Sequence, residues 1–252
     1  MGSLLKIFDL YTIHARLLPA LIAIVSPVAL ISTFININEY IIANSLVSLI
    51  ATLAFIPLLG SVARTQGQKV EKKILKRWKV LPTTRFLRHS DETYSTQKKA
   101  RLHKLLSDKS SIQLPSKEEE SINPALADET YNEAVSWLRE NTRDSKFAIL
   151  LNENIAYGKY RNLLGLRPIG IVLSIFPLLI FSLLFLLNYP DINNFNLVQS
   201  ITFFKEIRLA YWVTTAISIS SLIFWFFFIN EAGLEEIAHK YAHTLFKQLD
   251  SL

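Results

Sequence analysis

The chain contains no cysteine among its 252 residues, and it has only seven glycines. The first absence excludes disulfides, thiolate metal sites and a cysteine nucleophile. The glycines are scattered, so no glycine-rich loop can cradle a phosphate, and neither an H-E-x-x-H nor a G-x-S-x-G motif occurs. We therefore expect no enzyme, no catalytic residue and no cofactor.

Charge is missing from four long runs, residues 17–38, 40–63, 168–190 and 209–230. Each run has 22 to 24 residues, and charged residues bound all of them. The hydrocarbon core of a bilayer, about 30 Å thick, requires about 20 apolar residues of helix at about 1.5 Å each. The runs therefore predict an all-α membrane protein with four transmembrane helices and a helical cytoplasmic domain between the second and third.

The segment between the second and third runs is strongly basic. Residues 64–167 carry 21 Lys and Arg against 13 Asp and Glu, a net charge of +8 (21 − 13), whereas residues 191–208 are neutral. Lys and Arg near the ends of spans stay on the cytoplasmic side. We therefore expect a multi-pass protein of the bacterial inner membrane, with the basic segment and both termini in the cytoplasm.

The charge pattern divides the chain into four parts. They are an N-terminal segment with two spans (1–63), a basic helical domain (64–167), two further spans (168–230) and an amphipathic C-terminal helix (231–252). Inside the basic domain the pattern predicts helices over 69–78, over 96–106 after an N-cap at Ser95, from about 128, and over 146–163, with a loop over 107–123. The apolar face of the C-terminal helix is typical of an interfacial helix or of a subunit contact, and the pattern favours neither.

Residues 69–88 are the strongest candidate for a binding site. Eight basic side chains face one acid, Glu71, with Trp78 and Phe86 between them. Basic groups neutralise phosphates and aromatic rings stack on bases, so the segment suits a nucleotide or an oligonucleotide. The candidate ligand-binding residues are Lys72, Lys73, Lys76, Arg77, Arg85 and Arg88.

The alternative for this segment is a juxtamembrane basic stretch that fixes topology and touches anionic lipid. The lysines fit that alternative well because they directly follow the membrane exit. Arg85 and Arg88 fit it less well, because they lie beyond the helix break expected at Pro82.

Two further patterns have a functional and a structural interpretation. His239 and His243 lie four residues apart after Glu235, a spacing that suits a metal, but we favour a solvated helix face and expect no metal site. Thr214, Ser218 and Ser221 share one arc of the fourth run, either for helix packing or as part of a pore wall.

Asn44 in the second run is a further pore-lining candidate, because an amide inside a membrane needs a partner. The runs contain no Asp, Glu, Lys, Arg or His, which argues against a secondary transporter. Four helices are too few to enclose a water path comfortably, so a pore would require several copies of the chain.

Three stretches carry a resemblance to a known family. They are GQKVEKK at 67–73, LPTTRFLRH at 81–89 and GKYRNLLGLRP at 158–168. With them the chain resembles the four-span membrane effectors of Hailong-type bacterial anti-phage systems. The resemblance implies a homo-oligomeric channel that is held in check by an oligonucleotide made by a partner nucleotidyltransferase.

Two functions thus follow as expectations. The first is a homo-oligomeric membrane channel or effector, gated by an anionic nucleotide or oligonucleotide and active in anti-phage defence. The alternative is a non-conducting membrane scaffold whose basic domain recruits a partner.

Overall fold

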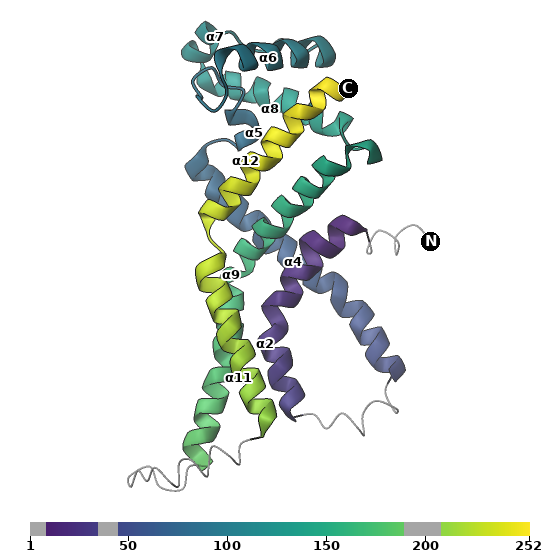
Figure 1. Cartoon of the computed structure of the whole chain (residues 1–252), viewed down its shortest axis with the longest axis vertical. Coiled ribbons are helices and arrows are strands. Elements are labelled where there is room, and N and C mark those ends of the chain that lie inside the picture. Colours follow the sequence, from purple (N-terminus) through teal and green to yellow (C-terminus); the bar gives the residue numbers. More distant parts are fainter. Residues whose placement is uncertain (1–8, 35–44, 189–207) are drawn as a thin grey trace. The chain divides into compact units, whose positions relative to one another are not determined.

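The computed structural model describes residues 9–34, 45–188 and 208–252, which fold into helices and connecting segments without a strand (Figure 1). The described residues divide into two compact units. The first unit comprises residues up to 68 together with 162–230, and the second comprises 69–161 together with 231–252. Helices α4 (Ser45–Trp78) and α9 (Ala148–Asn188) each begin in one unit and end in the other.

Three helical segments of the described chain are long and apolar enough to cross a membrane. They are Thr12–Phe34, Ala148–Leu187 and Leu209–Phe228. The first joins the π-helix η2 (Thr12–Leu17) to α2 (Leu18–Phe34), and the third joins α11 (Leu209–Ile223) to the π-helix η4 (Phe224–Phe228). The described residues confirm the prediction of an all-helical fold, and these three segments support the prediction of a membrane protein.

The second charge-free run, 40–63, overlaps the first half of α4 from Ser45 onward. Residues 40–44 lie outside the described part of the chain, so this span stays a prediction. The run predicted at 168–190 is confirmed as a helix up to Asn188, although α9 contains Pro168 and Pro177.

The first unit is held together by a close crossing of α4, α9 and η2. A Cβ atom on Gly165 would lie within 2.5 Å of the carbonyl oxygen of Gln66, so the backbones of α4 and α9 approach each other directly. One turn earlier on α9, the buried Asn162 donates from Nδ2 to the carbonyl oxygen of Ala15 at 2.6 Å. A side chain on Gly67 would overlap Asn162. Small residues thus let three helices meet around one satisfied amide.

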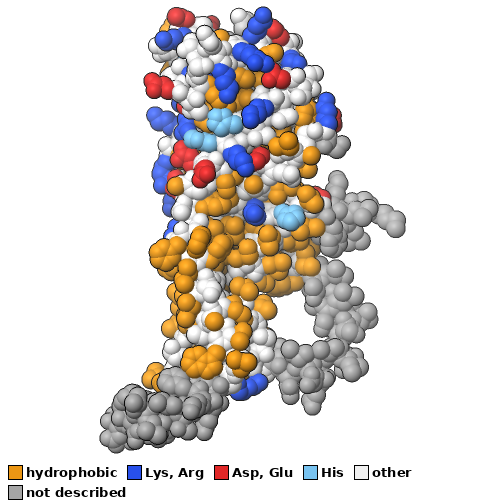
Figure 2. All heavy atoms as spheres, in the orientation of Figure 1, with side chains coloured by type: hydrophobic (Ala, Val, Ile, Leu, Met, Phe, Trp, Pro, Cys, Tyr) orange, Lys and Arg blue, Asp and Glu red, His pale blue; other side chains and the backbone are white. Residues whose placement is uncertain are grey.

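The second unit is a small helical domain. Its elements are α5 (Pro82–Arg85), α6 (Thr96–Ser110), α7 (Lys117–Ile122), α8 (Pro124–Asn141), η3 (Ser145–Phe147), α12 (Glu231–Lys247) and η5 (Gln248–Ser251), with the ends of α4 and α9. On the face shown in Figure 2, charged side chains gather over this unit, whereas hydrophobic side chains cover much of the first.

The core of the second unit joins segments that are far apart in the sequence. Leu106 of α6, Tyr131 and Leu138 of α8, and Leu245 and Leu249 near the C-terminus are all fully buried in one cluster. Each such aliphatic side chain stabilises the fold by about 1.5–3 kcal/mol. The C-terminal helix is therefore part of this core, which neither the interfacial nor the subunit-contact interpretation anticipated.

The helices predicted in the second unit are present, but several of their boundaries differ: α8 begins at Pro124 rather than near residue 128, and the short helix α5 was not predicted. The helix after Ser95 is confirmed, with Ser95 Oγ accepting from the backbone of Lys98 at 3.3 Å. The loop predicted over 107–123 is wrong, because α6 continues to Ser110 and α7 occupies Lys117–Ile122. A reciprocal capping box between Ser116 and Glu119 begins α7.

Candidate functional site

The exposed face of α4 in the second unit carries a row of lysines. Lys69, Lys72, Lys73 and Lys76 lie at positions i, i+3, i+4 and i+7, so they share one side of the helix, and all four are exposed. None of them has an ion pair within the described part of the chain. We call these four residues the lysine face. Its charges are available to an anion from solution.

Arg77 and Glu71 flank the lysine face but are already paired. Arg77 Nη2 lies 2.5 Å from a carboxylate oxygen of Glu231, in a half-exposed pair. Glu71 accepts hydrogen bonds from Arg161 at 3.0 Å and from the hydroxyl of Tyr157 at 2.6 Å. The one acid in the basic segment is thus held by α9, away from competition with a ligand for the lysines.

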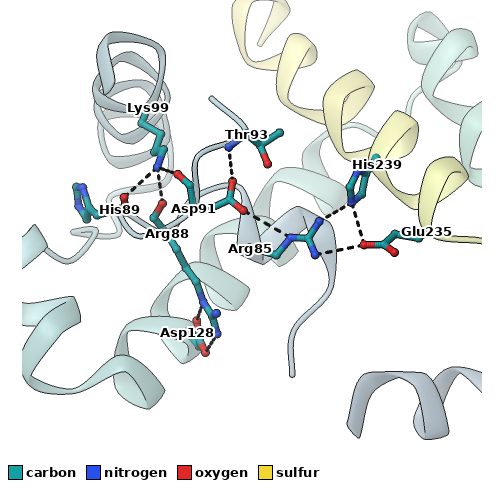
Figure 3. A network of polar contacts seen from close by, with 9 residues as sticks. All are labelled: Arg85, Arg88, His89, Asp91, Thr93, Lys99, Asp128, Glu235 and His239. Atoms are coloured by element: carbon teal, nitrogen blue, oxygen red, sulfur yellow. Dashed lines mark hydrogen bonds and ion pairs between the residues drawn. The ribbon is translucent and has the colours of Figure 1, made fainter. Parts of the chain in front are cut away.

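Arg85 lies at the centre of a polar network between α5, α12 and the segment that follows α5 (Figure 3). Its guanidinium is 3.4 Å from Glu235 and 3.6 Å from Asp91, and Nη2 donates to Nε2 of His239 at 2.5 Å. A guanidinium has no acceptor, so Nε2 of His239 must be unprotonated. Two carboxylates around one arginine leave the network with one excess negative charge, which disfavours a further anion.

Arg88 is committed to a carboxylate as well. Its Nε and Nη2 donate to the two oxygens of Asp128 on α8 at 2.6 and 2.5 Å, a bidentate pair with both side chains about four-fifths buried (Figure 3). The hydrogen bond to Asp128 raises the pKa of Arg88 further. Ligand binding by Arg85 and Arg88 stays a prediction, and an anion would first have to displace a carboxylate.

The segment between Arg88 and Ser95 is fixed by two buried charges. Lys99 donates from Nζ to the carbonyl oxygens of Arg88 at 2.8 Å and His89 at 3.1 Å, and to that of Asp91. Glu120 accepts from the backbone N–H groups of His89 and Ser90 at 2.7 and 3.0 Å. Burial alone would raise the pKa of Glu120, but these hydrogen bonds outweigh it and lower the pKa.

The two histidines of α12 pack against α5 and its neighbours. The ring centroids of His239 and His243 both lie 5.1 Å from that of Phe86, and His243 Nδ1 is 2.5 Å from the hydroxyl of Tyr94. Both histidines are therefore partly buried, with the His239 side chain 33% exposed, rather than fully solvated. Within the described residues no group of three potential metal ligands comes together, and the expected lack of a metal site stays a prediction.

The hydroxyl stripe of α11 is turned into the first unit. Thr214, Ser218 and Ser221 are at most 7% exposed. Thr214 Oγ1 lies 3.0 Å from Thr33 Oγ1, and Ser221 Oγ lies 2.8 Å from Ser174 Oγ. These contacts are typical of the packing interpretation, in which hydroxyls join helices of one chain. Asn44, the fourth pore-lining candidate, lies outside the described residues.

Several structural anchors were not singled out by the sequence analysis. Lys99 and Glu120 belong to polar stretches in which burial leaves no signal. Arg167 donates to the carbonyl oxygens of Trp225 at 3.0 Å and Phe226 at 3.3 Å, both within η4. Arg167 and Asn162 both lie in the stretch 158–168 that carries the resemblance. Their contacts join helices of the first unit, so this stretch has a structural role.

The chain matches no protein-family model, no curated protein and no solved structure.

Proposed function

We propose that this chain is a four-span protein of the bacterial inner membrane that binds an anionic nucleotide or oligonucleotide on the lysine face of α4. In this proposal several copies form a channel, and the ligand controls it. The observation that carries the proposal is the row of four exposed lysines without ion pairs among the described residues. Such a row tracks a phosphodiester backbone through charge alone.

The proposal adds one span to the three apolar helices. This is the second charge-free run, which includes the first half of α4. Phe55, Leu58 and Val62 of that half are 47–60% exposed, which suits contact with lipid. With four spans, the basic second unit and both termini lie in the cytoplasm, where a nucleotide signal can reach the lysine face.

Coupling follows from the continuity of α4 in this proposal. The lysine face and the apolar first half belong to one uninterrupted helix from Ser45 to Trp78. A ligand that binds the lysines more tightly in one arrangement of the helix would shift the population toward that arrangement. As the resemblance to Hailong-type effectors implies, we propose that an oligonucleotide from a partner nucleotidyltransferase keeps the channel closed in anti-phage defence.

The alternative is a non-conducting scaffold, and one observation favours it. Ile122 at the end of α7 and Leu126 at the start of α8 are 84% and 58% exposed, although they lie in the charged second unit. Neighbouring exposed apolar side chains of this kind suit a protein partner. The two proposals differ in whether ions flow.

The binding test compares wild type with the Lys72→Ala/Lys73→Ala/Lys76→Ala variant in detergent, with a fluorescent single-stranded oligonucleotide as probe. Loss of three phosphate contacts should weaken binding and reduce the slope of log K against log salt by about 2, at about 0.7 per contact on a single strand. Unchanged affinity and slope would contradict the proposed site.

A matched control is Arg101→Ala with Lys104→Ala on α6, which removes basic charge from another part of the second unit. If binding depends on net charge alone, this control loses affinity in proportion to the number of positive charges removed. The proposal predicts a loss specific to the lysine face.

A further inference from the structure

Six buried hydroxyl groups lie inside the first unit, far more polar than the apolar faces around them. They belong to α2, α9 and α11, and none of the residues is more than 7% exposed. The six are Ser26, Thr33, Ser174, Thr214, Ser218 and Ser221. We call them the hydroxyl seam. A buried hydroxyl in a membrane helix needs a partner, because hydrocarbon offers none.

Four members of the seam have partners. Thr33 and Thr214 join α2 to α11 at 3.0 Å, and Ser174 and Ser221 join α9 to α11 at 2.8 Å. Along α11 these two pairs lie on either side of Ser218.

Ser26 and Ser218 are different, because both are completely buried and neither hydroxyl has a hydrogen-bond partner among the described residues. A buried hydroxyl without a partner costs about 1–3 kcal/mol. Ser174 avoids this cost by donating to the carbonyl oxygen of Gly170, four residues earlier, at 2.7 Å. Ser26 and Ser218 do not use that local solution.

The two serines occupy the same stretch of the α2–α11 contact. Figure 1 shows the two helices side by side, and Thr33 meets Thr214 near one end. Farther along, an open groove of about 420 Å³ is lined by Ile22 and Val25 together with Ala216, Ile217, Ser220 and Ser221 of α11 and Phe224 of η4. Ser26 directly follows Val25 of the groove lining, and Ser218 lies on α11 between Ile217 and Ser220 of the same lining.

Pro27 adds a third polar group to this place. Proline has no N–H, so the carbonyl oxygen of Ala23 loses its partner in α2. Ala23 is 3% exposed and lies three residues before Ser26, on the same side of the helix. Two hydroxyls and one carbonyl are enough to hold an ordered water molecule.

We propose that Ser26, Ser218 and the carbonyl of Ala23 form a water-binding site inside each chain, closed by the Thr33–Thr214 and Ser174–Ser221 pairs. This site is the beginning of a hydrophilic path through a single chain, rather than between copies. The path rests on the proposed channel function, whereas the hydrated site does not.

The lack of cysteine makes a direct test possible in the full-length protein in liposomes. Ser26→Cys and Ser218→Cys each place one near-isosteric thiol at the site. A small neutral reagent, methyl methanethiosulfonate, reacts with the thiolate, which forms in water and not in hydrocarbon. The matched control is Ile219→Cys, next to Ser218 on α11 but 47% exposed on the apolar outer face.

We expect both seam cysteines to react at least about tenfold faster than Ile219→Cys, because only they contact water that supports a thiolate. Equal or slower labelling of both would overturn the site. Ser218→Ala provides a second measurement if a cysteine variant does not fold. A hydrated serine predicts an unchanged or lower melting temperature, and a rise would show a dry, unsatisfied hydroxyl.

The outcomes also separate this inference from the channel. Labelling without ion flux through the liposomes would keep the hydrated site and remove the channel. Ion flux without labelling would keep the channel and move its path to the interface between copies.

Discussion

At the residue scale, the first unit depends on positions where a side chain has no room. Gly165 places the backbone of α9 against that of α4, and a Cβ atom there would meet the carbonyl of Gln66 and the amide of Gly67. Backbone cannot move aside as the end of a side chain can. Asn162 fills the neighbouring space, and its side-chain amide donates a hydrogen bond to the carbonyl oxygen of Ala15.

Gly165→Ala should therefore push α4 and α9 apart and destabilise the protein by about 1–3 kcal/mol, as overpacking does in a tight core. The measurement is thermal unfolding in detergent. Gly60→Ala is the control, since its Cβ would meet only the flexible side chain of Leu17, at 3.1 Å, and the side chain of Arg16. Equal effects of the two substitutions would argue against the close crossing.

Arg88 provides a second prediction at this scale. Arg88→Met leaves Asp128 partly buried without its bidentate partner, and a hydrogen bond to a charged group contributes about 1.5–3 kcal/mol. We expect a loss of stability of that size, seen by thermal unfolding.

Arg101→Met is the matched control for Arg88, because its ion pair with Asp250 is 68% and 56% exposed and such pairs contribute little. If Arg88→Met kept full stability but lost oligonucleotide binding, Arg88 would be a ligand-binding residue and not an anchor.

At the scale of elements, α12 packs against α5 through His239 and His243, and His239 accepts from Arg85 only while its Nε2 carries no proton. Burial lowers the pKa of His239 and His243 below the usual 6.5, and the charges of Arg85 and Lys98 respectively lower it further. Glu235 and Asp91 oppose the shift at His239. Protonated His239 could no longer accept from Arg85.

The sign of the pH dependence follows from these directions. In the unfolded chain both histidines bind protons near pH 6.5, whereas the folded chain resists protonation until lower pH. Stability is therefore complete above about pH 7.5 and falls as pH decreases through about 6.5. Melting temperatures between about pH 8 and pH 5 should show this fall, and His239→Gln should reduce its slope. Burial also lowers the pKa of His103, so part of the dependence of melting temperature on pH should remain in the His239→Gln variant.

Some of the helices could be predicted from the sequence and others could not. The charge-free runs and the N-cap at Ser95 predicted helices because both signals are local. The capping box at Ser116 and Glu119 was equally local, but Pro115, Pro124 and a polar composition made 107–123 resemble a loop. The partner of α12 could not be predicted, because its periodicity gives an apolar face and not the residues, much earlier in the chain on α6 and α8, that cover it.

The same distinction applies to the candidate site. Basic composition marked residues 69–88, but only burial and pairing separate the free lysine face from Arg85 and Arg88, which are held by Glu235 and Asp128.

The stripe of α11 was predicted from helical spacing. Its partners Thr33 and Ser174 lie on other helices, so the hydroxyl seam could not be predicted from α11 alone.

At the scale of the whole molecule, the chain combines apolar helices that can span a membrane with a basic helical unit. Helices α4 and α9 each run from one unit into the other and join the two units covalently. Each unit is therefore made of two stretches of sequence, separated by a stretch that belongs to the other unit. This organisation suits a membrane protein that responds to a ligand from solution. The proposal of a ligand-controlled channel is the central claim that follows.

The most direct test of that claim is ion flux from liposomes that contain the purified full-length protein. Loss of trapped potassium is recorded with and without a single-stranded DNA of about ten nucleotides, a length within the usual range of single-strand binding sites. We expect the oligonucleotide to slow the flux through wild type and to leave the flux through Lys72→Ala/Lys73→Ala/Lys76→Ala unchanged. No flux above that of empty liposomes, or equal inhibition of both proteins, would contradict the account.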